Sequence, residues 1–92
     1  MFEEELCPWC RQWDADIGVV YSQTVEGKKA PLRRFDIVFQ QNFKGLARPV
    51  SYTPTFVLLD KGREIGRITG YPGEHFFWPM LGTLLEKLQH SE

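Results

Sequence analysis

The stretch Cys7-Pro8-Trp9-Cys10 places two cysteines three positions apart, directly before a helical pattern of apolar side chains. Proline is tolerated in the first turn of a helix, so we expect the helix to begin at Pro8 with Cys7 at its N-terminal end. Cysteines with this spacing at the start of a helix in an α/β chain are typical of a redox-active site. The pattern predicts a helix over residues 8–23, defined by Trp9, Trp13, Ile17, Val20 and Tyr21.

Further along the chain, Thr55-Phe56-Val57-Leu58-Leu59-Asp60 and Glu64-Ile65-Gly66-Arg67-Ile68-Thr69 are two runs with strand propensity. They flank Lys61-Gly62-Arg63, a short polar segment with a glycine, so the pair predicts a β-hairpin. The first run is apolar on both faces, which indicates an interior strand of a sheet. Another strand is expected over residues 32–38, where apolar and charged side chains alternate.

The C-terminal part of the chain predicts an amphipathic helix that begins near Glu74. We expect this helix to be kinked or restarted at Pro79, because proline removes a hydrogen bond of the helix interior. Residues 25–31 are expected to form a polar connection, and residues 39–52 show too little periodicity to predict anything but irregular structure. The order of elements predicts one α/β domain over residues 1–92, with helices covering a mixed sheet.

The composition excludes several classes of function. The chain has 92 residues and a formal net charge of −1, so it lacks the basic surplus that binds nucleic acid. No apolar run exceeds four residues, far short of the roughly 20 needed to cross a bilayer. Two thiols cannot complete a four-ligand zinc site, and His75 and His90 match no compact zinc spacing. We therefore expect no nucleic-acid partner, no membrane span and no metal.

The chemistry of the motif depends on the thiolate, which the N-terminal end of a helix stabilises. Lowering the pKa of Cys7 from about 8.5 to about 7 needs roughly 2 kcal/mol of preferential stabilisation. The helix field contributes only about 0.3–1 kcal/mol, so hydrogen bonds must supply the rest. Glu3, Glu4 and Glu5 oppose the thiolate. Cys10 is expected to be more buried and to attack the mixed disulfide that Cys7 forms.

The chain resembles the thioredoxin family over nearly its whole length. The resemblance lies in residues 2–10, in Tyr52-Thr53-Pro54-Thr55-Phe56-Val57-Leu58-Leu59-Asp60 and in the segment from Gly62 to Tyr71. The closing Gly70-Tyr71-Pro72-Gly73-Glu74-His75-Phe76-Phe77-Trp78 is similar to the SoxS-type periplasmic thioredoxins associated with bacterial sulfur oxidation. The resemblance implies a thioredoxin-like fold and a thiol-disulfide oxidoreductase. In it, Cys7 would be the attacking thiol and Cys10 the resolving thiol.

The resemblance also implies a docking surface for a disulfide-containing partner protein. Pro54 would be the cis-proline of the family, which turns the Thr53 backbone outward to pair with an extended partner segment. Trp9, Tyr52 and Tyr71 would give that surface an apolar floor. We further expect a monomer without a cofactor, reduced by an upstream thiol electron donor protein. The expected location is the periplasm, with the cytoplasm as the alternative.

Two features depart from the family. Thioredoxins carry a buried acidic residue six positions before the first cysteine, which assists proton transfer from the resolving thiol, but Met1 occupies that position here. Glu3, Glu4 or Glu5 could take its place, although three adjacent carboxylates are more often solvated. The chain also begins within the central strand, so the expected fold is N-terminally shortened and either marginally stable or part of a longer natural chain.

Two other functions stay open at this point. A Cys-Pro-aromatic-Cys motif near the N-terminus also suits a glutaredoxin-like, glutathione-dependent reductase, although Asp60-Lys61-Gly62-Arg63-Glu64 favours a thioredoxin hairpin. The other alternative is a non-catalytic thioredoxin-fold binding module, in which both cysteines pack as small apolar side chains. The same dithiol serves as reductant or oxidant, because reduction potentials span about −270 to −120 mV across this fold.

Overall fold

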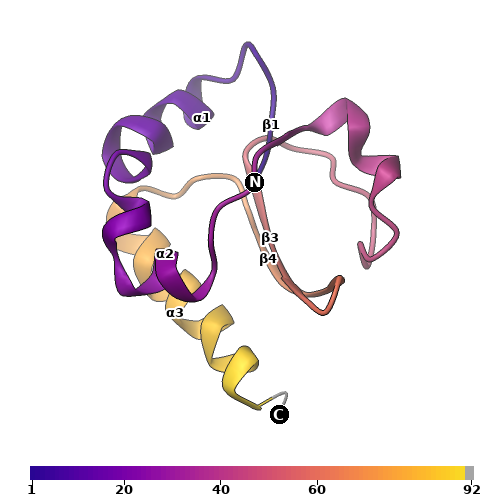
Figure 1. Ribbon diagram of the computed structural model, residues 1–92. Coiled ribbons are helices and arrows are strands. Elements are labelled where there is room, and N and C mark those ends of the chain that lie inside the picture. The colour runs from indigo at the N-terminus through magenta and orange to yellow at the C-terminus, as the bar shows by residue number, and fades with distance from the viewer. Residues whose placement is uncertain (91–92) are drawn as a thin grey trace.

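The computed structural model describes residues 1–90, with side chains up to residue 88, and contains a four-stranded mixed sheet in the order β2-β1-β3-β4. β1 (Phe2–Glu3) pairs parallel with β2 (Phe35–Asp36) and antiparallel with β3 (Thr55–Asp60). β3 also pairs antiparallel with β4 (Arg63–Thr69). Figure 1 shows the α-helices on one side of the strands and the segment after β2 on the other. The predicted mixed sheet flanked by helices is confirmed.

β3 and β4 form the predicted hairpin, which starts with Thr55 opposite Thr69. The two residues of its turn both have positive φ, 53° at Lys61 and 81° at Gly62. This combination gives the turn a twist that matches the twist of the two strands. β3 has a neighbouring strand on each side, so the prediction of an interior strand is correct.

The helix predicted over residues 8–23 is only partly correct. α1 spans Pro8–Trp13, and the chain then widens into a π-helical turn over Asp14–Gly18. Trp13 is fully buried, and a Cβ at Gly18 would lie 3.2 Å from its ring, so the glycine leaves room for the indole where the turn widens. The apolar spacing does not distinguish a regular α-helix from this wider turn.

A 3-10 turn over Tyr21–Gln23 leads into α2 (Val25–Lys29), where the sequence predicts only a polar connection. Thr24 caps this short helix, because its hydroxyl oxygen accepts a hydrogen bond from the Gly27 N–H at 2.9 Å. Threonine is a preferred N-cap residue, and it is the local sequence signal for the helix.

The strand predicted over residues 32–38 is reduced to the two residues of β2. The Asp36 side chain accepts a hydrogen bond from the Val38 N–H at 2.9 Å and caps a 3-10 helix over Ile37–Asn42. An aspartate that bonds to the backbone two residues further on starts a turn and so ends the strand. The alternation of apolar residues continues beyond this point and predicts a strand that is too long.

α3 (Glu74–His90) is one unbroken helix, so the restart expected at Pro79 does not occur. A proline removes a single hydrogen bond of the helix interior, and the rest of α3 keeps its helical pattern. Residues 43–54 contain no helix or strand, as predicted for most of residues 39–52. The largest side chains with almost no exposure are Trp13, Ile17, Pro54, Thr55, Ile68 and Phe77.

Candidate active site

The two cysteines form a disulfide at the start of α1, and their Cα atoms are 5.2 Å apart. Cys7 is the N-cap of the helix and Pro8 follows it in the first turn. Pro8 has no N–H, and the Cys10 N–H donates a hydrogen bond to Cys7 Sγ at 3.1 Å. A backbone donor is therefore in place to stabilise a thiolate on Cys7 once the disulfide is reduced.

The burial of the two cysteines differs from the sequence-based expectation. Cys7 is 4% exposed and Cys10 is 3% exposed, so Cys10 is not clearly the more buried residue in the disulfide state. The neighbouring apolar side chains are much more open, with Leu6 84% and Trp9 61% exposed. A partner that approaches the disulfide therefore meets exposed apolar surface next to it.

Thr53 lies against the loop that precedes α1, because its hydroxyl donates a hydrogen bond to Glu4 Oε1 at 3.1 Å. The peptide bond between Thr53 and Pro54 is cis. Pro54 is buried, and its carbonyl accepts a hydrogen bond from the Gly70 N–H at 2.7 Å, which joins this segment to the end of β4. The structure therefore brings the loop before Cys7 and the Thr53–Pro54 segment together.

Tyr71 is placed differently from the other predicted docking residues. It is 8% exposed, its ring centroid lies 6.1 Å from that of Phe77, and its hydroxyl donates to Asp16 Oδ2 at 2.7 Å. Burial and the Asp16 carboxylate raise the pKa of the Tyr71 hydroxyl well above its usual range. The ring is thus part of the core, with its polar end on a surface carboxylate.

A hollow of about 360 Å³ lies next to Cys10, and charged side chains form most of its lining. Arg34 links two of these side chains. Its guanidinium donates to both Glu3 oxygens at 2.7 and 2.9 Å and to Asp14 Oδ2 at 3.0 Å. The two carboxylates hold the pKa of Arg34 above its usual range. The lining consists of Glu3, Glu4, Glu5, Cys10, Arg11, Asp14 and Asp36.

Sequence reasoning missed Asp14 and Arg34 at this site. The available signal for Asp14 is its spacing of four from Cys10, which places the two side chains on the same face of a helix. Arg34 carries no such signal, because its contact with Asp14 joins residues twenty positions apart.

Comparison with known proteins places this geometry in a family. No family model and no curated protein matches the chain. A solved structure does match: the periplasmic thioredoxin SoxS from Paracoccus pantotrophus, in its reduced form, is 48% identical, covers 96% of this chain and 94% of its own, and has a TM-score of 0.89. The chain belongs to the SoxS-type thioredoxins. With its Cys7–Cys10 disulfide, it is a thiol-disulfide oxidoreductase.

In this thioredoxin, Met1 occupies the position of the buried acid of other thioredoxins. Met1 is 7% exposed and belongs to the apolar core that also contains Cys10 and Trp13. The core side of Cys10 therefore offers an apolar side chain at this position. The charged groups near Cys10 are those of the hollow.

A nearly buried ion pair that sequence reasoning also missed holds the loop leading to Thr53. Arg67 Nε and Glu64 Oε2 are 2.6 Å apart, and the side chains are 6% and 3% exposed. The guanidinium of Arg67 also donates to the carbonyls of Arg48 and Pro49 at 2.7 and 3.1 Å. Glu64 Oε1 accepts a hydrogen bond from the Ala47 N–H at 2.9 Å. The pair thus binds three consecutive loop residues, 47–49, to β4 through hydrogen bonds.

A β-bulge in β4 makes this ion pair possible. Residues three apart in a regular strand point to opposite faces of the sheet. The register of the hairpin shifts within β4, where Ile65 is an extra residue without a partner on β3. The extra residue brings Glu64 and Arg67 to the same face.

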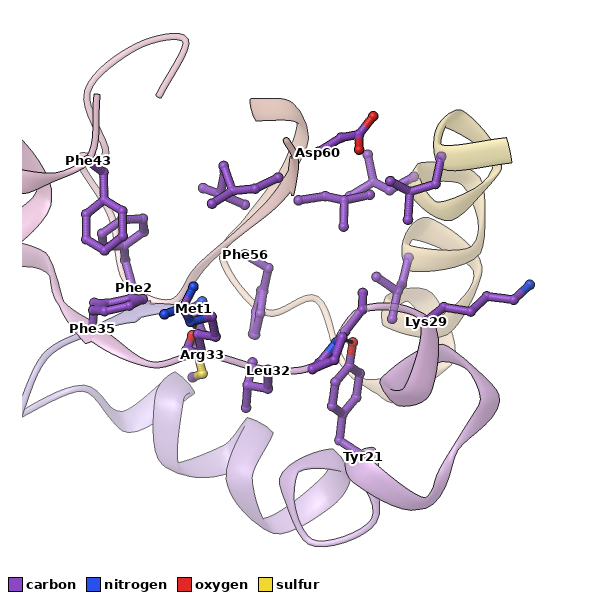
Figure 2. Close-up of a pocket in the computed structure, with 18 of the residues that line it drawn as sticks. Met1, Phe2, Tyr21, Lys29, Leu32, Arg33, Phe35, Phe43, Phe56 and Asp60 are labelled. Atoms are coloured by element: carbon purple, nitrogen blue, oxygen red, sulfur yellow. Dashed lines mark hydrogen bonds between the residues drawn. The ribbon is translucent and has the colours of Figure 1, made fainter. Parts of the chain in front are cut away.

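A larger cavity of about 470 Å³ lies away from the disulfide. Figure 2 shows it between Phe56 and Asp60 of β3, the segment from Lys29 to Arg33, and α3. Most of its lining is apolar, and neither cysteine contributes to it. This cavity is therefore separate from the two cysteines.

No metal site is seen among residues 1–90, because His, Cys, Asp and Glu side chains do not gather there in a group suited to an ion. The side chain of His90 lies outside the described residues. No helix in the same part of the chain is long and apolar enough to cross a membrane.

Proposed function

We propose that this thioredoxin exchanges disulfides with a partner protein, with Cys7 as the attacking thiol and Cys10 as the resolving thiol. The hydrogen bond from the Cys10 N–H to Cys7 Sγ carries this assignment. A hydrogen bond to a charged acceptor contributes about 1.5–3 kcal/mol. Lowering the pKa of Cys7 from about 8.5 to about 7 requires roughly 2 kcal/mol, so this bond and the helix field of about 0.3–1 kcal/mol together supply an amount of the required size. The first turn of α1 contains no acidic residue, so the carboxylates that oppose the thiolate are those of Glu3, Glu4 and Glu5 before the helix.

In the reductive direction, the Cys7 thiolate attacks one sulfur of the partner's disulfide. A new bond joins Cys7 to that sulfur, and the other partner sulfur leaves as a thiolate that takes up a proton. Cys10 then loses its proton and attacks Cys7 Sγ, which forms the Cys7–Cys10 disulfide and releases the second partner sulfur. The dithiol loses two electrons and the partner disulfide gains them.

The partner is expected to dock on the exposed apolar side chains around the disulfide. These are Leu6, Trp9 and Tyr52, each more than half exposed. We expect an extended partner segment to pair with the Thr53 backbone as an added strand and to place apolar side chains on Trp9. Tyr71 would support this surface from the core through its hydrogen bond to Asp16.

The remaining parts of the proposal follow from the SoxS-type family. The relative from Paracoccus pantotrophus is periplasmic, and we place this protein in the periplasm, in a pathway of sulfur oxidation. The dithiol needs no cofactor, so its electrons come from an upstream thiol donor protein. The protein is proposed to act as a monomer.

Single-cysteine variants test the roles of the two thiols. Cys10→Ser retains the attacking thiol and is expected to accumulate a mixed disulfide with insulin as the disulfide substrate. Cys7→Ser is expected to form none and to lose insulin reduction. A mixed disulfide on Cys7→Ser alone would reverse the assigned roles, and retained biological activity in both variants would indicate a binding module.

A matched pair of variants tests the docking surface. Trp9→Ala is expected to raise the KM for a protein disulfide and to leave the free energy of unfolding nearly unchanged, since the side chain is exposed. Tyr71→Phe is expected to lower the free energy of unfolding by about 1 kcal/mol, because it removes a hydrogen bond, and to leave KM unchanged. Equal increases in KM would place Tyr71 in the docking surface as well.

The midpoint potential of the Cys7–Cys10 couple decides the direction of exchange. A value of about −270 mV indicates a reductant, and a value of about −120 mV indicates an oxidant. Measuring insulin reduction with glutathione and with a thioredoxin-type donor separates a glutaredoxin-like activity from the proposed one, because only the former would be sustained by glutathione.

A further inference from the structure

Cys10 has to lose a proton when it attacks the mixed disulfide, and Met1 cannot accept one. The hollow beside Cys10 offers other acceptors, and it has room for several water molecules at about 360 Å³. Charged groups face it from every element around it. They are Glu3 from β1, Glu4 and Glu5 from the following loop, Arg11 from α1, Asp14 from the π-helical turn and Asp36 from β2, and Arg34 bonds to Glu3 and Asp14.

Asp14 is the carboxylate of the hollow that shares a helix face with Cys10. Its N–H donates to the Cys10 carbonyl, so the two residues lie one helical turn apart on one face. Asp14 Oδ2 accepts a hydrogen bond from Arg34. Asp14 Oδ1 is buried, lies 2.9 Å from Arg34 Nη2 in an ion pair without hydrogen-bond geometry, and is 3.2 Å from the position that a Cβ would take at Gly18. Asp14 thus accepts one hydrogen bond from Arg34, whereas Glu3 accepts two.

Glu3 is in a different situation. Each of its two oxygens accepts a hydrogen bond from Arg34, at 2.7 and 2.9 Å, in the bidentate arrangement that holds a carboxylate most firmly. Protonation of Glu3 would break one of these bonds. Arg34 therefore engages both oxygens of Glu3 and, through its third bond, positions Asp14 on the helix face of Cys10.

We propose that Asp14 accepts the proton of Cys10 through a water molecule in the hollow, and that Arg34 is a positioning residue for Asp14. This proposal rests on the roles proposed for Cys7 and Cys10. The proton passes from Cys10 Sγ to the water and from the water to the Asp14 carboxylate. The Cys10 thiolate attacks Cys7 Sγ, the bond to the partner sulfur breaks, and the departing partner thiolate takes up a proton from Asp14 or from solvent.

Removing the Asp14 carboxylate changes the rate of attack by Cys10 in opposite directions for a proton acceptor and for a simple negative charge. A nearby carboxylate that is only a charge disfavours the Cys10 thiolate, so its removal would speed the attack. A carboxylate that accepts the proton speeds the attack, so its removal would slow it. Asp14→Asn therefore gives opposite results under the two descriptions.

A two-stage reaction of the reduced protein with 4,4′-dithiodipyridine measures the relevant step. The reagent reacts with thiols at acidic pH, so it forms the mixed disulfide on Cys7 and releases a first thiopyridone. A jump to higher pH starts the attack by Cys10, which releases a second thiopyridone. Failure of the first release would contradict the proposed role of Cys7, whereas the rate and pH profile of the second release test Asp14.

For Asp14→Asn, the second release is expected to slow about tenfold near neutral pH, with its pH profile moved to higher pH. The rates should converge at alkaline pH, where Cys10 ionises without help. Asp14→Glu is expected to restore most of the rate because it keeps the carboxylate, and it keeps the proposal testable if Asp14→Asn folds poorly. Glu5→Gln, which removes a charge from the same hollow without touching Arg34, is expected to change the rate by less than about twofold.

Three results would overturn the proposal. The first is an unchanged or faster second release in Asp14→Asn. The second is an equal slowing in Glu5→Gln, which would show that the charge of the hollow matters and the position of the carboxylate does not. The third is a slow second release in Asp14→Glu together with normal thermal unfolding.

Discussion

Two arginine–carboxylate clusters in this molecule use the same chemical groups in different surroundings. In the Glu64–Arg67 cluster, both side chains are nearly buried, and backbone groups of the loop satisfy the remaining donors and acceptors. In the Glu3–Arg34–Asp14 cluster, the side chains are between 27% and 40% exposed. One carboxylate oxygen of the second cluster, Asp14 Oδ1, has no hydrogen-bond donor among the described residues.

The difference shows that burial decides whether such a cluster stabilises the fold or exchanges protons. A buried and fully bonded pair is costly to alter, because each group has lost its water and depends on its partner. A half-exposed group is solvated in both the folded and unfolded chain, so it adds little to stability and remains free to exchange protons. We therefore expect changes to the first cluster to affect folding and changes to the second to affect the rate of disulfide exchange.

The largest expected effect follows from Arg67→Ala. This change leaves Glu64 buried without its counter-charge and frees the carbonyls of Arg48 and Pro49. We expect a loss of about 3 kcal/mol in the free energy of unfolding, measured by urea denaturation. A loss below about 1 kcal/mol would mean that water replaces the guanidinium and that this pair resembles the exposed cluster.

Gly45→Ala is expected to have the next largest effect, because the loop approaches the hairpin most closely there. The Gly45 carbonyl accepts a hydrogen bond from the Glu64 N–H at 2.8 Å, and a Cβ at residue 45 would overlap the Gly62 carbonyl oxygen. We expect a loss of about 2 kcal/mol in urea denaturation, since the backbone has to move apart.

Gly82→Ala is the matched control for the substitution at Gly45. Residue 82 lies within α3, and no atom lies within 4 Å of the Cβ that would be added there. The change should stabilise the protein by about 0.5–1 kcal/mol, because alanine favours the helix over the unfolded chain. Equal effects of the two substitutions would contradict the close approach of the loop to the hairpin.

A smaller effect is expected from acid. Arg67 holds the pKa of the Glu64 carboxyl below its usual value. The folded state therefore binds fewer protons than the unfolded state at mildly acidic pH, so this contribution to stability is complete above about pH 4.3 and is lost as the pH falls through the folded pKa. Urea denaturation across this range should show a steeper acid loss in the parent protein than in Glu64→Gln. Parallel profiles would contradict the linkage.

The smallest effect is expected from Arg34→Gln. The side chains of Glu3 and Asp14 are 27% and 40% exposed, so each carboxylate is in contact with water when the guanidinium is removed. We expect a loss of at most about 1 kcal/mol, which added salt should reduce further. A loss as large as that of Arg67→Ala would show that the second cluster is structural, and it would weaken the distinction between the two.

The sequence predicts those parts of the molecule that depend on local patterns. Cys7 and Pro8 mark the start of α1, and the hairpin follows from two β-prone runs around Gly62. The predicted helix over residues 8–23 is too long, because apolar spacing does not reveal the widened turn at Gly18. The predicted strand over residues 32–38 is too long as well, because the capping bond of Asp36 competes with the apolar alternation.

The two ion clusters could not be predicted from the sequence, for a physical reason. Arg34 meets Asp14 and Glu3 only after β1 and β2 have paired, and nothing local distinguishes it from a solvated surface arginine. Arg67 and Glu64 share a face only because of the bulge at Ile65. The burial of Tyr71 is equally hidden, because its hydroxyl partner, Asp16, is 55 positions away in the chain.

Alkylation of the reduced protein by iodoacetamide, followed separately at Cys7 and Cys10 by mass spectrometry across a pH series, is the most direct measurement. We predict that the alkylation rate of Cys7 follows an apparent pKa of about 7. At neutral pH, Cys7 should react about tenfold faster than Cys10. Two results would disagree with this prediction: an apparent pKa of about 8.5 for Cys7, as in an unperturbed thiol, or faster alkylation of Cys10 than of Cys7. Either outcome would contradict the stabilised thiolate at the start of α1.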